Sequence, residues 1–121
     1  MDTSESPLEL AIASARVAAR LCRKVQAGIP ASMDKDDRSP VTLADYGSQA
    51  IILRSVKESF PDHGVMSEEG TAHLRSNADP AQIERLVALV SDAIGGEAEF
   101  EQVCTWIDHS GPSSAWAWCI D

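Results

Sequence analysis

The end of the chain constrains its fold more than any other stretch, because it predicts a strand whose two faces are both apolar. Trp116, Trp118 and Ile120 would lie on one face of this strand, and the small residues at 115, 117 and 119 on the other. A strand of this kind belongs inside a sheet that is covered on both sides. The rest of the sequence supplies hardly any other strands, so most of the sheet that this strand requires is missing from the chain.

Helical periodicity accounts for most of the remaining sequence. Ser6-Pro7-Leu8-Glu9 is a capping box with proline at the first helical position, and it predicts a helix over about 7–27 that ends at Gly28. The apolar stripe of this helix is Leu8, Ile12, Ala15, Ala19 and Cys22. Further helices are expected over about 43–59, from Pro80 to Ile94 with Asp79 as the cap, and, shorter, around Phe100 to Ile107.

Two connecting segments complete the expected organisation. Residues 29–41 are polar, charged and without periodicity, and predict a mobile loop. Val65-Met66 predicts a short strand that places Glu68 at its end.

The 121 residues and their 44% hydrophobic content fit one globular domain. We therefore expect a single, mostly helical domain of the mixed α/β (α+β) class.

The charge balance excludes some classes of partner. The chain has 10 basic and 19 acidic residues, a formal charge of −9, which disfavours binding to nucleic-acid polymers and to anionic membranes. It has no apolar run long enough to span a membrane, and its acidic start does not resemble a targeting peptide, so a cytoplasmic location is expected, or an organellar one if the true N-terminus is longer. Cys22, Cys104 and Cys119 lack the spacing of a zinc site and are expected to be small buried hydrophobes.

Three carboxylates are candidates for chemistry. They are Asp45 in SPVTLADYGSQA, Glu68 in VMSEEG and Asp121 in WCID. Carboxylates at strand ends and a helix start are suited to hold Mg²⁺ against a phosphate and to orient an attacking water. Two of them also have a structural interpretation: Asp45 fits the third position of a capping box that starts at Thr42, and Glu68-Glu69 fits a solvated turn. Asp121 by itself indicates neither role.

The other polar and aromatic candidates favour structural roles. His63, His73 and His109 lack a second ligand at metal spacing and are expected at the solvated surface. Trp116 and Trp118 could stack on a nucleobase, but their alternation on a strand favours packing in the core.

Taken together, SPVTLADYGSQA, FPDHGVMSEEG and WCID resemble the motifs of the lithium-sensitive, magnesium-dependent phosphatases of the inositol monophosphatase superfamily. Within it, AARLCRKVQ and SPVTLADYGSQA are most similar to the 3'(2'),5'-bisphosphate nucleotidases of plants and algae, enzymes of sulfur metabolism. The resemblance runs from about residue 8 to Asp121. It implies that 1–121 is the N-terminal fragment of one layered αβαβα sugar-phosphatase domain, truncated at the family's D-P-I-D-G-T motif.

The resemblance also implies roles for the carboxylates. Asp45 matches the catalytic residue that accepts a proton from the attacking water, and Glu68 and Asp121 match ligands of Mg²⁺. Ser67 stands where the family has glycine or alanine. The full-length form would remove the 3'-phosphate of adenosine 3',5'-bisphosphate, giving AMP and phosphate, whereas this fragment is expected to be inactive. Two alternatives stay open: an inositol phosphate or inositol monophosphate phosphatase, and a non-catalytic truncated product or partner-binding fragment.

Overall fold

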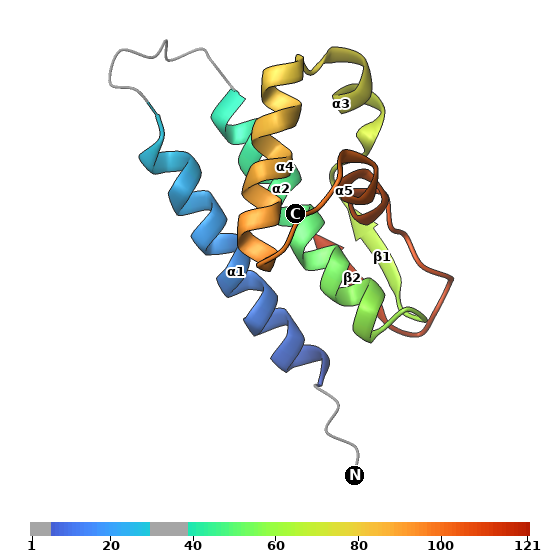
Figure 1. Ribbon diagram of the computed structural model, residues 1–121. Coiled ribbons are helices and arrows are strands. Elements are labelled where there is room, and N and C mark those ends of the chain that lie inside the picture. Colours follow the sequence, from blue (N-terminus) through green and yellow to red (C-terminus); the bar gives the residue numbers. More distant parts are fainter. Residues whose placement is uncertain (1–5, 30–38) are drawn as a thin grey trace.

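The protein is described by a computed structural model, which covers residues 6–29 and 39–121 (Figure 1). These residues form a mostly helical chain with one small sheet, which confirms the predicted mixed α/β class. The elements in chain order are α1 (Pro7–Ala27), α2 (Ser39–Ser59), β1 (Gly64–Ser67), α3 (Thr71–Asn77), α4 (Pro80–Ile94), α5 (Phe100–Ile107) and β2 (Ala117–Ile120).

The helix ends that carry local signals lie where the sequence predicts them. Ser6 caps α1 by accepting a hydrogen bond from the Glu9 amide at 3.1 Å, and Pro7 occupies the first turn. In the same way Asp79 caps α4, which ends at Gly95 in the left-handed region with φ of 73°. Capping chemistry that acts within one turn therefore fixes these boundaries.

Two helices differ from the prediction. α2 begins at Ser39, so Ser39 to Val41, expected in the mobile loop, belong to its first turn. A proline in the first turn leaves no hydrogen bond unmade, so Pro40 does not delay the helix start. The rest of the predicted loop, residues 30–38, lies outside the described residues. α3 was not predicted, because it has seven residues and its cap is Gly70, which offers no side-chain acceptor.

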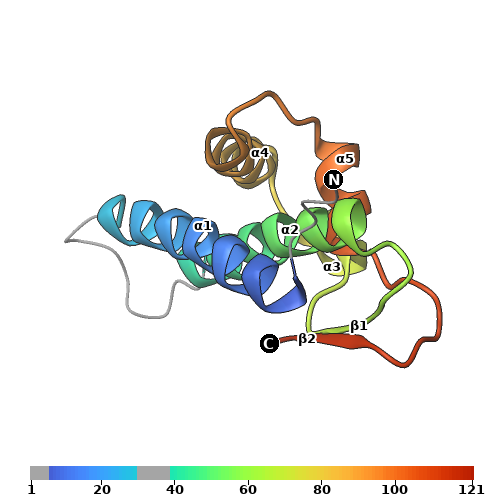
Figure 2. The ribbon, with the colours of Figure 1, turned by 90° about the horizontal axis from the view of Figure 1, so that it is seen from below.

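The elements pack in three layers, with α1 and α2 in the middle (Figure 2). On one side, α4 and α5 cover α2 through a core that includes Leu86, Val90 and Val103, all fully buried. On the other side, a smaller cluster of Leu10, Leu53 and Val56 receives the inner face of the sheet. The two clusters hold α2 between the helices and the sheet, so α2 is the element on which the other parts converge. Over residues 6–29 and 39–121, none of the helices combines the length and the apolar character that crossing a membrane requires.

The stripe expected to mark the apolar side of α1 faces away from the core. Leu8 is 69% exposed and Ile12 is 45% exposed. The buried side instead carries Leu10 and Leu21, together with Ser14, whose hydroxyl donates to the Leu10 carbonyl at 2.8 Å. Because that local bond satisfies the serine, a polar residue can occupy the buried face.

The two strands are parallel, with Val65 opposite Trp118 and Ser67 opposite Ile120. Trp118 and Ile120 pack on the smaller cluster, as the alternation predicts. Trp116 does not: it precedes the strand and is 61% exposed. Among the described residues β2 pairs only with β1, so each strand has one unpaired edge. The outer face of the sheet is uncovered, since Met66 and Cys119 are exposed there.

Two expectations about single residues are corrected on this sheet. Cys119, expected to be buried, is exposed on the outer face, whereas Cys104 is buried as predicted and Cys22 is half-buried. His63, expected at the solvated surface, stacks on Phe60 with ring centroids 4.7 Å apart and accepts a hydrogen bond from the Trp118 indole at 3.0 Å. The stacked rings shield the histidine that the sequence places in a turn.

The outer face of the sheet predicts self-association of the isolated chain. Met66, 68% exposed, and Trp116 lie at or beside unpaired strand edges, which are templates for pairing with other chains. We expect sedimentation at tens of micromolar, roughly the range where exposed edges associate, to show oligomers or aggregates. Met66→Glu should shift the distribution toward monomer, and Ala72→Glu, on the exposed side of α3, should not. A compact monomer of the parent chain at these concentrations would contradict the prediction.

His109, which follows α5, predicts a loss of stability at acid pH. Burial, and then the charge of Lys57, lower the pKa of His109 below its ordinary value of 6.5, and its Nε2 is buried without a partner among the described residues. The unfolded chain therefore takes up a proton at a higher pH than the folded chain, and stability falls as the pH drops below about 6.5. We expect melting curves from pH 7 to 5 to fall less steeply for His109→Phe than for the parent. The control Val90→Ala removes part of a buried side chain but no titratable group, so it should lower the melting temperature and keep the parental slope. Equal slopes for all three proteins would refute this role.

Candidate active site

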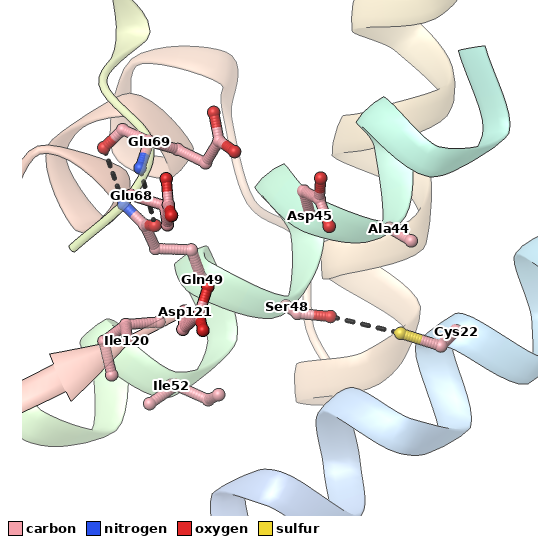
Figure 3. Close-up of a pocket in the computed structure, with 10 residues that line it drawn as sticks. All are labelled: Cys22, Ala44, Asp45, Ser48, Gln49, Ile52, Glu68, Glu69, Ile120 and Asp121. Carbon is pink, nitrogen blue, oxygen red and sulfur yellow. Dashed lines mark hydrogen bonds between the residues drawn. The ribbon is translucent and has the colours of Figure 1, made fainter. Parts of the chain in front are cut away.

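The three candidate carboxylates line one pocket. Asp45, Glu68 and Asp121 border a hollow of about 480 Å³, and Glu69 joins them there (Figure 3). Residues separated by up to 76 positions (121 − 45) are thus gathered at one place from three elements of the fold. The opposite wall carries the Cys22 thiol, which lies 3.3 Å from the Ser48 hydroxyl. The structure brings all the predicted site residues together.

Asp45 reaches the pocket from within α2. The helix starts at Ser39, more than one turn before Asp45, and its first turn contains no acidic residue. Asp45 is therefore not the third residue of a capping box, and the structural interpretation of this carboxylate is wrong. Its side chain is exposed and makes no hydrogen bond or ion pair to another described residue.

Glu68 and Asp121 reach the pocket from the ends of the parallel strands. Each directly follows its strand, and the last residues of the strands, Ser67 and Ile120, are partners in the register. The amide of Glu68 continues the ladder by donating to the Ile120 carbonyl at 3.1 Å. Because parallel strands end at the same edge of a sheet, Glu68 and Asp121 leave the sheet at neighbouring positions, and both line the pocket. Glu68-Glu69 is therefore part of the pocket wall as well as a turn.

The pocket concentrates negative charge. Burial, and then the nearby charges of Asp45 and Glu68, raise the pKa of Glu69 above its ordinary value. Burial also raises the pKa of Tyr46, followed by the charges of Glu69, Asp108 and Asp45, so this phenol stays protonated at neutral pH. Tyr46 does not line the pocket itself, so the carboxylates are the groups there that can accept a proton.

The donor set suits a hard cation such as Mg²⁺ in kind, since it consists of carboxylate oxygens that repel one another in the absence of positive charge. Within residues 6–29 and 39–121, however, no three acidic, histidine or cysteine side chains converge closely enough to enclose a metal ion by themselves. Glu68 and Asp121 are the residues placed to contribute ligands, and water or a phosphate would have to supply others. The pocket thus offers part of a ligand set.

Sequence reasoning missed one residue of this site. Gln49 lines the pocket between Asp45 and the acidic turn, is 2% exposed, and hydrogen-bonds to the backbone of Glu69. The only sequence signal is its position four residues after Asp45, which places both on the same side of a helix. A glutamine at that spacing does not predict a site residue unless the segment that it contacts, here the backbone of Glu69, is known.

Comparison with known proteins gives the pocket a context. No protein-family model matches the chain. It is 37% identical over 100 residues, 79% of its length, to 3'(2'),5'-bisphosphate nucleotidase 1 of Arabidopsis thaliana. It is 40% identical over 100 residues to 3',5'-bisphosphate nucleotidase 2 of the same plant, again 79% of its length. With the 3'(2'),5'-bisphosphate nucleotidase of Schizosaccharomyces pombe it shares 34% identity over 101 residues, 78% of its length.

The matched region is a minor part of each relative: 28% of the first Arabidopsis protein and of the Schizosaccharomyces protein, and 29% of the second Arabidopsis protein. The chain therefore spans less than a third of the length of these relatives. Their similarity over most of this chain agrees with the motifs that carry the three pocket carboxylates, and confirms the resemblance drawn from the sequence. The chain is a homologue of 3'(2'),5'-bisphosphate nucleotidases over most of its own length and matches less than a third of theirs, in agreement with its resemblance to the inositol monophosphatase superfamily.

Proposed function

We propose that this chain supplies part of the active site of a magnesium-dependent phosphatase whose full-length form removes the 3'-phosphate of adenosine 3',5'-bisphosphate. One observation carries the proposal: Asp45, Glu68 and Asp121, from a helix and two strand ends, line a single pocket. The names of the relatives supply the substrate class, a nucleoside bisphosphate. The products are AMP and phosphate.

The chemistry follows from the placement of the three side chains. Glu68 and Asp121 would hold Mg²⁺ by their carboxylate oxygens, and the ion would supply the positive charge that a phosphate needs at so acidic a site. Asp45 accepts a proton from the attacking water, which it can do because its carboxylate is exposed to the pocket and unpaired by the other described residues. The water oxygen bonds to phosphorus, and the bond from phosphorus to the ribose oxygen breaks. That oxygen leaves in line and takes a proton from the solvent, to which Asp45 returns the proton it accepted.

A chimera tests this function. In the chimera, the present chain replaces the matching region of the Arabidopsis 3'(2'),5'-bisphosphate nucleotidase 1. That region makes up 28% of the Arabidopsis protein. We expect the chimera to release phosphate from adenosine 3',5'-bisphosphate with Mg²⁺, and chelation of the metal to abolish the release. The 121-residue chain alone should show no turnover above background, because its carboxylates do not enclose a metal by themselves.

The control is the remainder of the Arabidopsis protein without this chain. If that remainder is as active as the chimera, the chain contributes no catalytic group. A folded but inactive chimera would also count against the proposal, and turnover by the 121-residue chain would contradict the expected inactivity of the fragment.

A further inference from the structure

Gln49 makes an unusually complete set of hydrogen bonds for a side chain in a pocket wall. Its Nε2 donates to the carbonyl oxygens of Glu69 and Ile107, both at 2.8 Å, and its Oε1 accepts from the Glu69 amide at 3.2 Å. Both donors and the acceptor of the amide are used, and the side chain is 2% exposed. A buried polar group satisfied in this way has a single preferred position.

Two of these hydrogen bonds bind the backbone of Glu69, which lies in the acidic turn Glu68-Glu69. Gln49 contacts both the N–H and the C=O of Glu69, so it fixes the orientation of that backbone as a neighbouring strand would (Figure 3). The adjacent Glu68 is held from the other side, because its N–H donates a hydrogen bond to the Ile120 carbonyl. The turn is thus fastened to α2 at one residue and to the end of β2 at the next.

The third bond extends the connection to α5. Ile107 is the last residue of α5, and the next residue, Asp108, accepts a hydrogen bond from the Thr71 amide at 3.0 Å at the start of α3. The acidic turn lies between β1 and α3, so it is anchored at both of its ends and, through Gln49, at its centre. One side chain of α2 therefore joins three segments that are distant in the sequence.

We propose that Gln49 is a positioning residue, which holds the turn Glu68-Glu69 at a fixed place relative to Asp45 so that the pocket carboxylates are arranged for a cation before it binds. The inference rests on the proposed function. Gln49 and Asp45 lie one turn apart on α2, so the distance between the proton acceptor and the acidic turn is set by the helix and one amide. Like charges around a pocket drive such a turn outward, and the two-point contact with Glu69 opposes that movement.

Few side chains can replace this contact. Asparagine has the same amide on a shorter stem, glutamate lacks the two donors, and methionine fills a similar volume without any hydrogen bond. Gln49→Met and Gln49→Asn therefore both remove the grip on Glu69, one with an apolar and one with a polar side chain. Val90→Ala on α4 is the matched control, because Val90 is fully buried but does not line the pocket.

The test uses the 121-residue chain with Mn²⁺ as the probe, at a concentration low enough to keep it dispersed. Mn²⁺ affinity is read from the loss of the electron paramagnetic resonance signal of the free ion, which is measurable below the concentrations at which the chain is expected to associate. Second-sphere partners of metal ligands typically change affinity by about 10- to 100-fold, so both Gln49 variants should raise the Mn²⁺ Kd by about tenfold or more, and Val90→Ala should leave it unchanged. Without metal, hydrogen exchange of the Glu69 amide should accelerate in the Gln49 variants beyond any global loss of stability.

The outcomes separate this inference from the proposed function. Glu68→Gln is the reference, because it removes a proposed ligand and leaves Gln49 in place. If Glu68→Gln weakens Mn²⁺ binding and the Gln49 variants behave like Val90→Ala, the positioning role is wrong and the metal site stands. If the parent chain and Glu68→Gln bind Mn²⁺ equally, the metal site is wrong and the inference fails with it. If either Gln49 variant does not fold, the other decides.

Discussion

Asp45→Asn in the chimera should lower kcat by about 100-fold or more, because a neutral amide cannot accept a proton from water at neutral pH. The same substitution should hardly affect folding. Asp45 lies past the first turn of α2, its side chain is exposed, and it makes no bond to another described residue. Exposed substitutions of this kind usually change stability by about 0.5 kcal/mol or less, so the melting temperature should stay within about 4 °C of the parent.

Asp92→Asn is the matched control for this experiment. Asp92 is also an exposed helical aspartate, but it lies on α4, pairs with Lys24, and does not line the pocket with the carboxylates. The control should keep the parental kcat. The assignment of Asp45 as proton acceptor would be wrong if Asp45→Asn kept most of its rate, or if rate and melting temperature fell together.

The distinction between a helix cap and a proton acceptor shows where sequence reasoning reaches its limit. The spacing from Thr42 to Asp45 is that of a capping box. It competes with Ser39-Pro40, which has the serine-proline pair of the α1 start but no acidic residue three positions after the serine. Where the cap and its partner lie within one turn and the chain around them is unambiguous, as at Ser6 and Asp79, the prediction is correct.

The remaining errors share a cause, since each depends on contacts between distant segments. α3 is short, and the group that accepts from its first amide is Asp108, 37 residues away. The buried side of α1 contains Ser14, which hydropathy ranks below the exposed Leu8. Gln49 acquires its role only when the turn at Glu69 folds against it. The carboxylates were found because their motifs resemble a family, whereas their common pocket is a property of the packed chain.

That pocket also depends on a glycine outside it, and we expect Gly111→Ala to be the most destabilising of three glycine substitutions. Gly111 has φ of 66°, which favours glycine, and a methyl group there would overlap the carbonyl oxygen of His63 in the turn before β1. The overlap is with backbone, so it cannot be relieved by a side-chain rotation. β1 would have to move, and with it the turn that carries Glu68.

Two other glycines separate the causes of this effect. Gly96 lacks a positive φ, and a methyl group added to it would meet no atom within 4 Å, whereas Gly95 has φ of 73° with the same free space. Gly96→Ala should therefore be close to neutral, and Gly95→Ala should cost about 1–2 kcal/mol from the left-handed backbone alone. Gly111→Ala adds the steric overlap and should cost about 3 kcal/mol or more, near the upper end for single substitutions. Thermal melts of the three variants check the order.

The same series tests how the site depends on the sheet. Gly95 and Gly96 follow α4, on the other side of α2 from the strands, so their variants should leave the Mn²⁺ affinity of the chain unchanged. Gly111→Ala should weaken that affinity even at a temperature where the variant remains folded, because the ends of β1 and β2 present Glu68 and Asp121 to the pocket in one register. A Gly111→Ala chain that melts like Gly95→Ala would show that the loop yields to the methyl group. Unchanged Mn²⁺ binding in a destabilised Gly111→Ala chain would show that the carboxylates keep their places without the strand pairing.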